Sequence, residues 1–583
     1  MAINRRQIIH AGTGLFAGLG LAACGNDSQR EQASNISEDA GAGTIVFRNG
    51  IVLPVDQGFS EHAALAIRGN RVLAIGSEAD VVAAAGAGAR SIDLQGRVVL
   101  PGFIEPHMHF AMLAGLGHLE DIGPFNRPTF DAALAAIRDI RQAAIEEGPE
   151  TWVMGRQFDP ILLEPPRDLT TTELDELVPD RPAFFLNASG HIGYANSLGL
   201  QAGGIGPDTT DPAGGEIGRF DDGTPNGVLY GQSAYFPVML ANQQIVDRMG
   251  SQFVDAGRQV GEQAAALGIT TLCDQATGGL AGPADIDGYR AMFDGGRMKA
   301  RIRAYLYSAQ PGWDEAGIMP GDGDELMRFS GWKIVTDGSN QGFTGRQREP
   351  YVGSDSHGLF YVEPEDLRAI VLERTGQGWP MAIHGNGDAA IDSILDAMDA
   401  AAASGTDVRA LRVRIEHASI LHDEQIARMQ EHGIVPSFLI NHVHYWGHVM
   451  RDQVFGPEKV QLLDRCASVE RAGLNWIIHS DAPVSPLGPL HMIRVAVARD
   501  LWKEPATILA PEERVSVESA IRAQTITAAW AQHEEDELGS LEPGKLADFV
   551  ILEEDPRAVE PTAISDIAVS ETWMDGVQRF SGS

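Results

Sequence analysis

The stretch that decides the fold is VVLPGFIEPHMH, residues 98–109, in which a short apolar run leads through a Pro-Gly turn to two histidines. His107 and His109 are two residues apart. Because successive strand residues point to opposite faces, both imidazoles point to the same side. Two neutral imidazoles on one side can hold one divalent ion. The pair alone is a weak signal, since histidines also serve structural roles in cores and at surfaces.

The same arrangement recurs further along the chain. A short apolar run reaches a residue able to serve as a ligand at Lys333 in GWKIV, His384 in MAIH, His417 in RIEH and Asp481 in WIIHSD. A parallel (β/α) barrel places its active site at the carboxyl ends of its strands. The order of these residues therefore predicts an α/β chain with the site of a metal-dependent hydrolase.

Lys333 leaves two interpretations of the metal site open. A free lysine is cationic and has no acceptor, so it cannot bind a metal. Carbamylation of its amine by CO2 would give a carboxylate that can bridge two ions. Pairing with a carboxylate such as Asp337 would instead make the lysine structural, and a single ion would remain, held by the histidines and Asp481. Zinc is the favoured divalent metal in both cases.

The charge balance argues against a polyanion as partner. The 583 residues include 44 basic and 80 acidic side chains, for a formal net charge of −36. Such a surface repels nucleic acid and anionic lipid headgroups. The hydrophobic fraction of 44% is typical of a globular protein with an ample core, and the length exceeds one average domain. The expected partner is a small molecule, and the sequence is compatible with a homo-oligomer.

The first 24 residues are typical of an export signal. Arg5 and Arg6 precede a short apolar stretch that ends in LAAC at Cys24, which resembles a bacterial lipobox. The stretch is too short to span a bilayer, so we predict an exported protein of the periplasm or cell envelope, held at the membrane only by lipid on Cys24. A plain Sec-type signal is the alternative, and the choice between Sec and twin-arginine export stays open. We interpret Cys273 and Cys466 as buried apolar residues.

The two ends of the remaining chain both consist of short strand-like runs separated by turn residues. Residues 25–43 are small and polar and predict a flexible tether. Short strand-like runs fill 44–100 and return at 538–583, which predicts one small composite β-sandwich built from both termini. The signals Asn49-Gly50 and Gly69-Asn70 predict hairpin turns between the first runs.

The middle, 101–537, alternates helical and strand signals, as the βα units of a barrel do. A region rich in Gly, Pro and Asp at about 150–245 predicts an insertion that covers the barrel mouth. The helices predicted in this part of the chain cover 130–147, 254–267, 365–376 and 423–433.

Together these residues resemble the amidohydrolase superfamily, in particular its YtcJ-like branch, which includes N-substituted formamide deformylases. The resemblance covers about 44–580. Its motifs here are PGFIEPHMH at 101–109, SGHIGYANS at 189–197, DGS at 337–339, HGNGD at 384–388, RIEHA at 414–418, SDAPV at 480–484 and GSLEPGKLAD at 539–548. Glu105-Pro106 departs from the commoner Asp followed by a small residue. Proline restricts the residue before it, so we expect a differently shaped metal loop, which bears on substrate more than on metal binding.

The resemblance implies a (β/α)8 TIM-like barrel with a composite β-sandwich, and hydrolysis of an amide or related C–N bond. Carried over by motif, the ligands end strand one (His107, His109), strand four (Lys333), strands five and six (His384, His417) and strand eight (Asp481).

Further residues are expected around the metal. His191, from the insertion, would orient the substrate or polarise its carbonyl, or else be a structural histidine near Asn196. Asp388 and Glu416 would orient ligand imidazoles through their free ring nitrogens. The candidates for lining the pocket are Asn441, His442, His444 and Trp446, although a third metal or a polar rim explains the two histidines equally well.

The resulting hypothesis is a metal-dependent amidohydrolase in which metal-activated hydroxide attacks an amide carbonyl and Asp481 shuttles the proton. One alternative is a deaminase or cyclic-amide hydrolase on the same scaffold, which ammonia release from an amino-heterocycle would reveal. Another is a metal-dependent isomerase or decarboxylase, which would not incorporate 18O from water. A catalytically silent binding lipoprotein is the last, and the intact ligand set argues against it.

Overall fold

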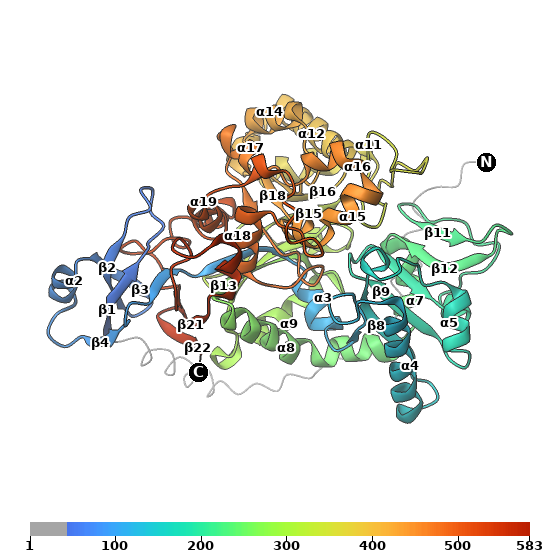
Figure 1. Ribbon diagram of the computed structural model, residues 1–583, viewed down its shortest axis with the longest axis horizontal. Helices are drawn as coiled ribbons and strands as arrows, with labels where there is room; N and C mark the ends of the chain where they lie inside the picture. Colours follow the sequence, from blue (N-terminus) through green and yellow to red (C-terminus); the bar gives the residue numbers. More distant parts are fainter. Residues whose placement is uncertain (1–42, 583) are drawn as a thin grey trace. The chain divides into compact units, whose positions relative to one another are not determined.

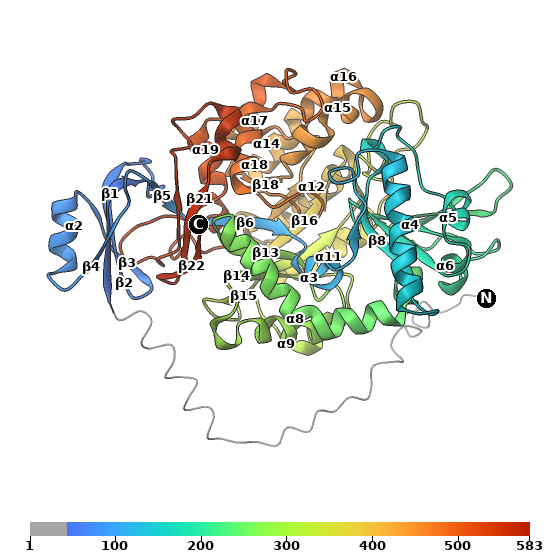
Figure 2. The ribbon, with the colours of Figure 1, turned by 60° about the horizontal axis from the view of Figure 1, so that its bottom comes forward.

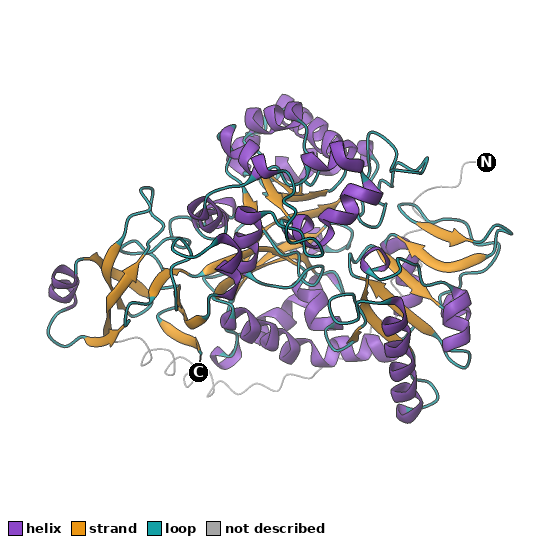
Figure 3. Ribbon diagram, viewed as in Figure 1, coloured by secondary structure: helices purple, strands orange, loops and turns teal. Residues whose placement is uncertain are grey.

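The computed structural model describes residues 43–582, which fold into α/β structure with three sheets (Figures 1 and 3). The predicted export signal with Cys24, and the tether as far as residue 42, lie outside the described residues. Among the described helices, none has both the length and the apolar character that crossing a bilayer requires.

The central sheet is a nearly closed barrel of eight parallel strands, in the order β6-β13-β14-β15-β16-β17-β18-β19. The predicted barrel is therefore confirmed. Its strands are β6 (Phe103–Met108), β13 (Ile269–Thr277), β14 (Arg301–Tyr307), β15 (Met327–Val335), β16 (Met381–Gly385), β17 (Arg414–His417), β18 (Val435–Phe438) and β19 (Ile477–Ile478). Most of these strand residues are buried and apolar, as expected for strands covered on both faces.

Helices surround the barrel (Figures 1 and 2). The main ones are α3 (Phe110–Leu116), α8 (Gln243–Ala266), α9 (Asp285–Met292), α11 (Pro364–Gly376), α12 (Asp388–Ala403), α14 (Asp423–His432), α17 (Cys466–Arg471), α18 (Pro489–Ala498), α19 (Val517–Ala523) and α20 (Ile526–Ala531). Shorter helical segments are α10 (Trp313–Ala316), α13 (Val408–Leu411), α15 (Gly447–Val449) and α16 (Gly456–Lys459). Cys273 and Cys466 are both buried free thiols, in agreement with their interpretation as core residues.

Strands from both ends of the described chain form one continuous eight-stranded sheet, in the order β22-β21-β20-β5-β1-β2-β3 with β4 beside β1. They are β1 (Thr44–Val52), β2 (His62–Arg68), β3 (Arg71–Gly76), β4 (Arg90–Asp93), β5 (Val98–Pro101), β20 (Phe549–Leu552), β21 (Val569–Met574) and β22 (Val577–Ser581), with α2 (Glu78–Ala85) packed on the first three. The Phe47 ring lies 5.0 Å from that of Phe549 and 5.2 Å from that of Trp573, so the two ends share one aromatic core.

One of the two predicted hairpin turns in this sheet is wrong. Gly69, at φ 59°, does connect β2 to β3, but Asn49, also at φ 59°, lies inside β1. The register between β1 and β2 shifts from Arg48 to Val52. Asn49-Gly50 therefore forms a bulge in a continuous strand, because a left-handed residue bends a strand as readily as it closes a hairpin.

The segment expected to cover the barrel mouth forms a six-stranded sheet of its own, in the order β11-β12-β10-β9-β8-β7. It begins at Glu120, earlier than the expected 150. Its strands are β7 (Glu120–Asp121), β8 (Val153–Phe158), β9 (Ala183–Asn187), β10 (Ile192–Ala195), β11 (Glu216–Arg219) and β12 (Pro225–Tyr230). Its helices are α4 (Phe130–Glu147), α5 (Thr171–Leu177), α6 (Ser197–Ala202) and α7 (Gln232–Leu240). Two apolar clusters give this layer its own core.

Candidate metal centre

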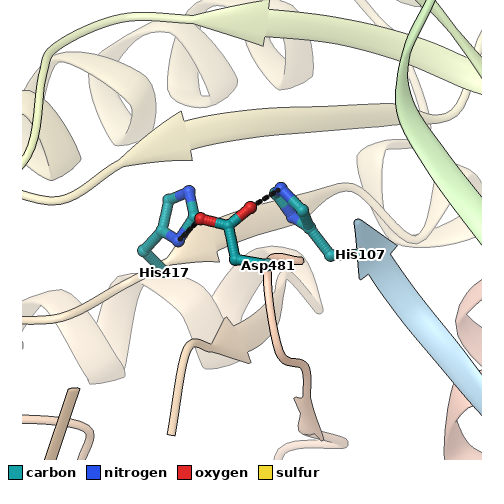
Figure 4. A group of neighbouring side chains, drawn as sticks. All are labelled: His107, His417 and Asp481. Atoms are coloured by element: carbon teal, nitrogen blue, oxygen red, sulfur yellow. Dashed lines mark ion pairs between the residues drawn. The ribbon is translucent and has the colours of Figure 1, made fainter. Parts of the chain in front are cut away.

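The side chains at the carboxyl ends of strands one and eight meet around the carboxylate of Asp481. Its Oδ1 lies 3.1 Å from His107 Nε2, and its Oδ2 lies 3.9 Å from His417 Nδ1 (Figure 4). The same Oδ1 lies 3.2 Å from His109 Nε2. Backbone hydrogen bonds fix this approach, since Asp481 N–H donates to His107 O and His109 N–H donates to Ala482 O. Ligands that follow different strands are thus brought to one point.

His384 and Lys333 lie at the ends of neighbouring strands. The His384 ring centroid is 4.4 Å from that of His417, and its Nε2 is 3.3 Å from Asp337 Oδ1. Lys333 is fully buried, and its Nζ has no hydrogen-bond partner within the described residues. Asp337 is held instead by the backbone N–H groups of Arg346, Asn386 and Gly387, so the alternative in which it pairs with Lys333 finds no contact in its favour.

Several buried polar atoms at this point lack a hydrogen-bond partner among the described residues. They are His107 Nε2, His417 Nδ1, Asp481 Oδ1 and Lys333 Nζ. Buried polar atoms are normally paired, because an orphaned group keeps its desolvation penalty. One ligand atom each from His107, His417 and Asp481 lies within 4.8 Å of the others, which is a spacing that suits one bound ion. The donor set of imidazoles and a carboxylate fits a divalent metal.

The protonation states of these groups suit metal binding. Burial lowers the pKa of His107, and burial together with the neighbouring His384 lowers that of His417 well below its usual value. Burial opposes ionisation of Asp481, but His107 and His417 hold the pKa of its carboxyl well below the usual range. Neutral imidazoles and an ionised carboxylate are the forms that bind metals. Burial also lowers the pKa of the Lys333 ammonium, to about 8.

Glu416, predicted to orient a ligand imidazole, contacts the His107 ring. Its Oε2 accepts a 2.6 Å hydrogen bond from His107 Nδ1 and a 2.7 Å bond from Ser437 Oγ, while Arg414 Nε lies 2.7 Å from Oε1. Although burial acts to raise it, Arg414 and His107 hold the pKa of Glu416 well below 4.5. The contact fixes His107 as the tautomer whose Nε2 is free to face the centre.

Three residues at the candidate ligands have a strained backbone. His417, Ala418 and Asp481 have φ values of 68°, 46° and 57°, in the left-handed region that residues with a Cβ rarely adopt. Each such residue costs about 1–3 kcal/mol and persists where the surrounding structure enforces it. The strain accompanies the sharp turns that bring the ligand side chains together.

His191, a predicted site residue, lies beside the candidate ligands. It lines a cavity of about 90 Å³ together with His109 and Asp481, and its ring centroid is 5.1 Å from that of His384. Burial lowers the pKa of His191 to about 4, so the ring is neutral near pH 7. Asn196 is occupied elsewhere, capping α6 through a bond from Gly199 N–H. Most of the remaining lining is apolar: Met112, Leu116, Leu186, Phe236, Met239 and Leu280.

Asp388 does not orient a ligand imidazole. Its carboxylate lies 2.9 Å from Lys459 Nζ and 3.1 Å from His422 Nε2, and it accepts a 2.7 Å bond from Arg348 N–H. The carboxylate is directed to these groups because Asp388 begins α12, where a carboxylate stabilises the helix N-terminus. The side chain nearest to such a role for His384 is Asp337.

Of the four pocket-lining candidates that follow β18, only His442 lies close to a candidate ligand. His442 has its ring centroid 6.4 Å from that of His417. The other three make hydrogen bonds away from it: Asn441 donates to Ser485 Oγ, His444 pairs with Asp500 O and Trp446 donates to Asp159 Oδ2. Of these four described residues, none lines the cavity beside the metal centre. A π-helical turn over His442–Trp446 directs the side chains toward neighbouring elements.

Two residues of the centre were missed by sequence reasoning. The His479 ring stacks on that of His107, with centroids 4.4 Å apart, and His107, Glu416 and His479 form a second close group of candidate ligands. His479 and Asp481 are two apart, the same spacing as His107 and His109, and this was the signal available. Glu105 accepts bonds from Ser480 N–H and Oγ, and so ties strand one to strand eight.

The barrel fold and the clustered candidate ligands suggest a class of enzyme, and comparisons with known proteins identify its family. Residues 90–580 match the Amidohydrolase family, and the chain belongs to that family. It is 29% identical to the N-substituted formamide deformylase of Arthrobacter pascens, over 92% of this chain and 98% of that protein. It is 26% identical to the putative amidohydrolase YtcJ of Bacillus subtilis, over 83% of this chain and 89% of that protein.

A solved structure has the same fold. An uncharacterized metal-dependent hydrolase from Pyrococcus horikoshii matches with a TM-score of 0.69 at 20% identity, over 89% of this chain and 99% of that one. The predicted branch of the superfamily is confirmed by these relatives. Family membership and the clustered candidate ligands together support a metal-dependent hydrolase.

Proposed function

We propose that this protein hydrolyses the amide C–N bond of a small molecule, giving a carboxylic acid and an amine. The observation that carries the proposal is the set of buried, unpartnered nitrogen and oxygen atoms at the carboxyl ends of the barrel strands, beside a cavity lined by His191. Similarity to an N-substituted formamide deformylase supports an amide as the substrate class.

The residues that would hold the metal are His107, His109, His384, His417 and Asp481, with zinc as the expected ion. A divalent ion held by them would supply Lewis acidity and lower the pKa of a coordinated water from about 15.7 toward about 7. Glu416 keeps His107 aimed at the centre through its 2.6 Å bond to Nδ1. The histidines stay neutral because burial opposes their protonation.

Asp481 and His191 are the chain's own catalytic groups in this proposal. Asp481 is ionised and lies at the point where the ligand side chains meet, so its carboxylate can accept a proton from the attacking water and pass it to the leaving nitrogen. His191 is neutral, and its Nδ1 has no hydrogen-bond partner within residues 43–582. A neutral imidazole N–H can donate to the carbonyl oxygen, where negative charge develops as water adds.

We propose that Lys333 is carbamylated and joins the ligands of a second ion. Its amine is fully buried without a hydrogen-bond partner among the described residues, and burial favours the neutral form. In the neutral form the nitrogen lone pair attacks CO2, an N–C bond forms, and one proton is released. The product is a carboxylate that can bridge two ions.

The substrate we expect is a small amide with an apolar substituent. Apolar side chains form most of the lining of the cavity beside His109 and His191, and a small hydrophobic group gains binding free energy when it leaves water there. Amides that differ only in this substituent should therefore differ in KM.

The experiment is turnover of neutral N-substituted amides by the metal-loaded enzyme, with the acid and the amine both quantified in 18O water. Equal amounts of both products, with one 18O in the acid, are expected. Asp481→Asn should lower kcat by about 10²–10⁴-fold. The same substitution at Asp388, which lies outside the centre, is the matched control. Ammonia release from amino-heterocycles without amide turnover would favour a deaminase, and turnover without 18O would favour an isomerase or decarboxylase.

We also propose that the protein acts outside the cytoplasm, in the periplasm or cell envelope, and is held at the membrane by lipid on Cys24 alone. The support is the LAAC sequence that ends at this cysteine. Labelled fatty acid should enter the wild-type protein and not Cys24→Ala, and label that persists in the variant would contradict this. The acidic surface argues against nucleic acid as a partner, and a homo-oligomer is compatible with the sequence.

A further inference from the structure

A second and larger cavity lies between the six-stranded layer and the loop that follows β15. Its volume is about 400 Å³, against about 90 Å³ for the cavity beside the metal centre. We call it the outer cavity and define it by Asp159, Asp168, Tyr194, Glu216, Tyr230 and Gln341.

The same two segments of the chain border the outer cavity and the candidate metal centre. The β9–β10 hairpin carries Asn187 and Ile192, which line the outer cavity, and between them Ser189 and His191, which line the cavity beside the metal. The loop after β15 is shared in the same way, since Gly338 O contacts His384 Nε2 and Gln341 lines the outer cavity. One hairpin and one loop therefore separate the two spaces.

The outer cavity is strongly acidic. Among the described residues that line it, Asp159, Asp168 and Glu216 face a single base, Arg167, which is already paired with Glu173. Asp168 and Glu216 have no hydrogen-bond or ion-pair partner among the described residues. Both side chains reach solvent, but desolvation by the surrounding protein raises the pKa of both. The charge of Asp168 raises the pKa of Tyr194 and of Tyr230. The carboxylates and the two aromatic rings thus border one space.

Gln341 gives independent support for a ligand site in this space. Its side chain is only 5% exposed, it lines the outer cavity, and its Oε1 has no hydrogen-bond partner among the described residues. A buried amide oxygen is normally paired, because an unpaired one keeps its desolvation penalty. It is an acceptor, as the carboxylates are. In the described part of the chain, Asp168, Glu216 and this amide oxygen are thus free acceptors, which suits a hydrogen-bond donor that carries positive charge.

We propose that the outer cavity is a binding site for an organic ammonium ion. Carboxylates supply the charge, Gln341 Oε1 accepts an N–H, and Tyr194 and Tyr230 add aromatic lining. Two sources share this chemistry: a charged arm of the substrate, or the amine that amide hydrolysis releases. The assignment of a source depends on the proposed amide hydrolysis, whereas the binding site itself does not.

Direct binding is the first test, made by calorimetry on the metal-loaded enzyme at pH 8 with benzylammonium and with neutral benzyl alcohol of similar shape. Benzylammonium should bind, more weakly at high salt, and benzyl alcohol should not. Asp168→Asn with Glu216→Gln should weaken binding by about tenfold or more, since bonds to charged groups are strong. Both residues are exposed and unpartnered in the described structure, so the variant should fold.

The matched control changes an exposed acidic pair elsewhere, Glu365→Gln with Asp366→Asn on α11, and removes the same net charge. Equal weakening in the control would show a general surface effect and overturn the proposal. So would the absence of benzylammonium binding, or equal binding of the alcohol.

The source is then assigned by kinetics with paired amides. A lower KM for an amide with an ammonium arm than for its neutral isostere, equalised in the cavity variant, assigns the site to substrate. Inhibition by the released amine that is relieved in the variant assigns it to product. If neutral amides turn over but neither effect is seen, the link to the reaction is refuted while the amide hydrolase stands.

Discussion

Replacing Glu416 with glutamine would keep the shape of the side chain and remove the negative charge that holds His107. Glu416 is fully buried and accepts from His107 Nδ1 at 2.6 Å, from Arg414 Nη2 at 3.0 Å and from Ser437 Oγ at 2.7 Å. In the variant, Arg414 keeps its charge in the core without a counter-ion. Breaking one partner of such a buried pair costs about 3–5 kcal/mol of unfolding free energy.

The same substitution should weaken metal binding by about 10–100-fold, because the ring of His107 loses the acceptor that fixes its tautomer and orientation. Metal affinity would be measured by competition with a chelator, at a temperature where circular dichroism shows the variant to be folded. Loss of stability alone would not change the affinity of the folded protein, so the two effects are separable.

Ser437→Ala is the matched control, since it removes one neutral donor to Glu416 and leaves the charge. It should cost about 1 kcal/mol and change metal affinity little. A folded Glu416→Gln protein with wild-type metal affinity would refute the claim that Glu416 positions His107.

Two further predictions concern His191, beside the candidate ligands, and Asp159, in the wall of the outer cavity. His191→Asn should lower kcat by about 10²–10³-fold with metal content unchanged, as expected when a donor to the developing oxyanion is lost; unchanged kcat would exclude that role. Burial raises the pKa of Asp159 from 3.8 to about 6, so the folded state binds the proton more tightly and wild-type stability falls as pH rises from about 4 to about 6. Asp159→Asn lacks this titration and should gain at most about 3 kcal/mol relative to wild type across that window in urea unfolding, while a difference constant with pH would contradict this.

The sequence predicted well those features that a local pattern determines. Helix α4 spans Phe130–Glu147, as predicted, because Thr129 caps its first turn and Gly148 follows its last residue. The ligands were found because each ends an apolar strand, and parallel strands bring such ends to one edge. Helix α8 begins at Gln243 rather than 254, although Ile245, Met249 and Phe253 continue its buried face at four-residue spacing. The predicted insertion extends to about 245, so it includes only the start of this helix, and no prediction covers the residues that follow before 254.

Contacts between distant segments were not predictable. Asp388 was placed near the ligands by its motif, yet its carboxylate pairs with Lys459 from another element. Asp337 was weighed as a partner for Lys333, but three backbone amides hold it. The partners of a buried carboxylate depend on which groups the tertiary structure brings within hydrogen-bond distance. The spacing of residues along the chain does not determine this. His479 stacks on His107 for the same reason, since only barrel closure brings strand eight beside strand one.

The central claim is that the unpartnered atoms of His107, His417, Asp481 and Lys333 are metal ligands. The measurement that tests it most directly is metal content per folded chain by elemental analysis, with bicarbonate supplied, on wild type, His107→Ala with His417→Ala, and Lys333→Ala. The account predicts two ions in wild type, loss of metal from the double variant, and loss from Lys333→Ala. One ion in both wild type and Lys333→Ala would make the lysine structural. A folded, active wild type without metal, or a double variant that keeps its metal, would contradict the account.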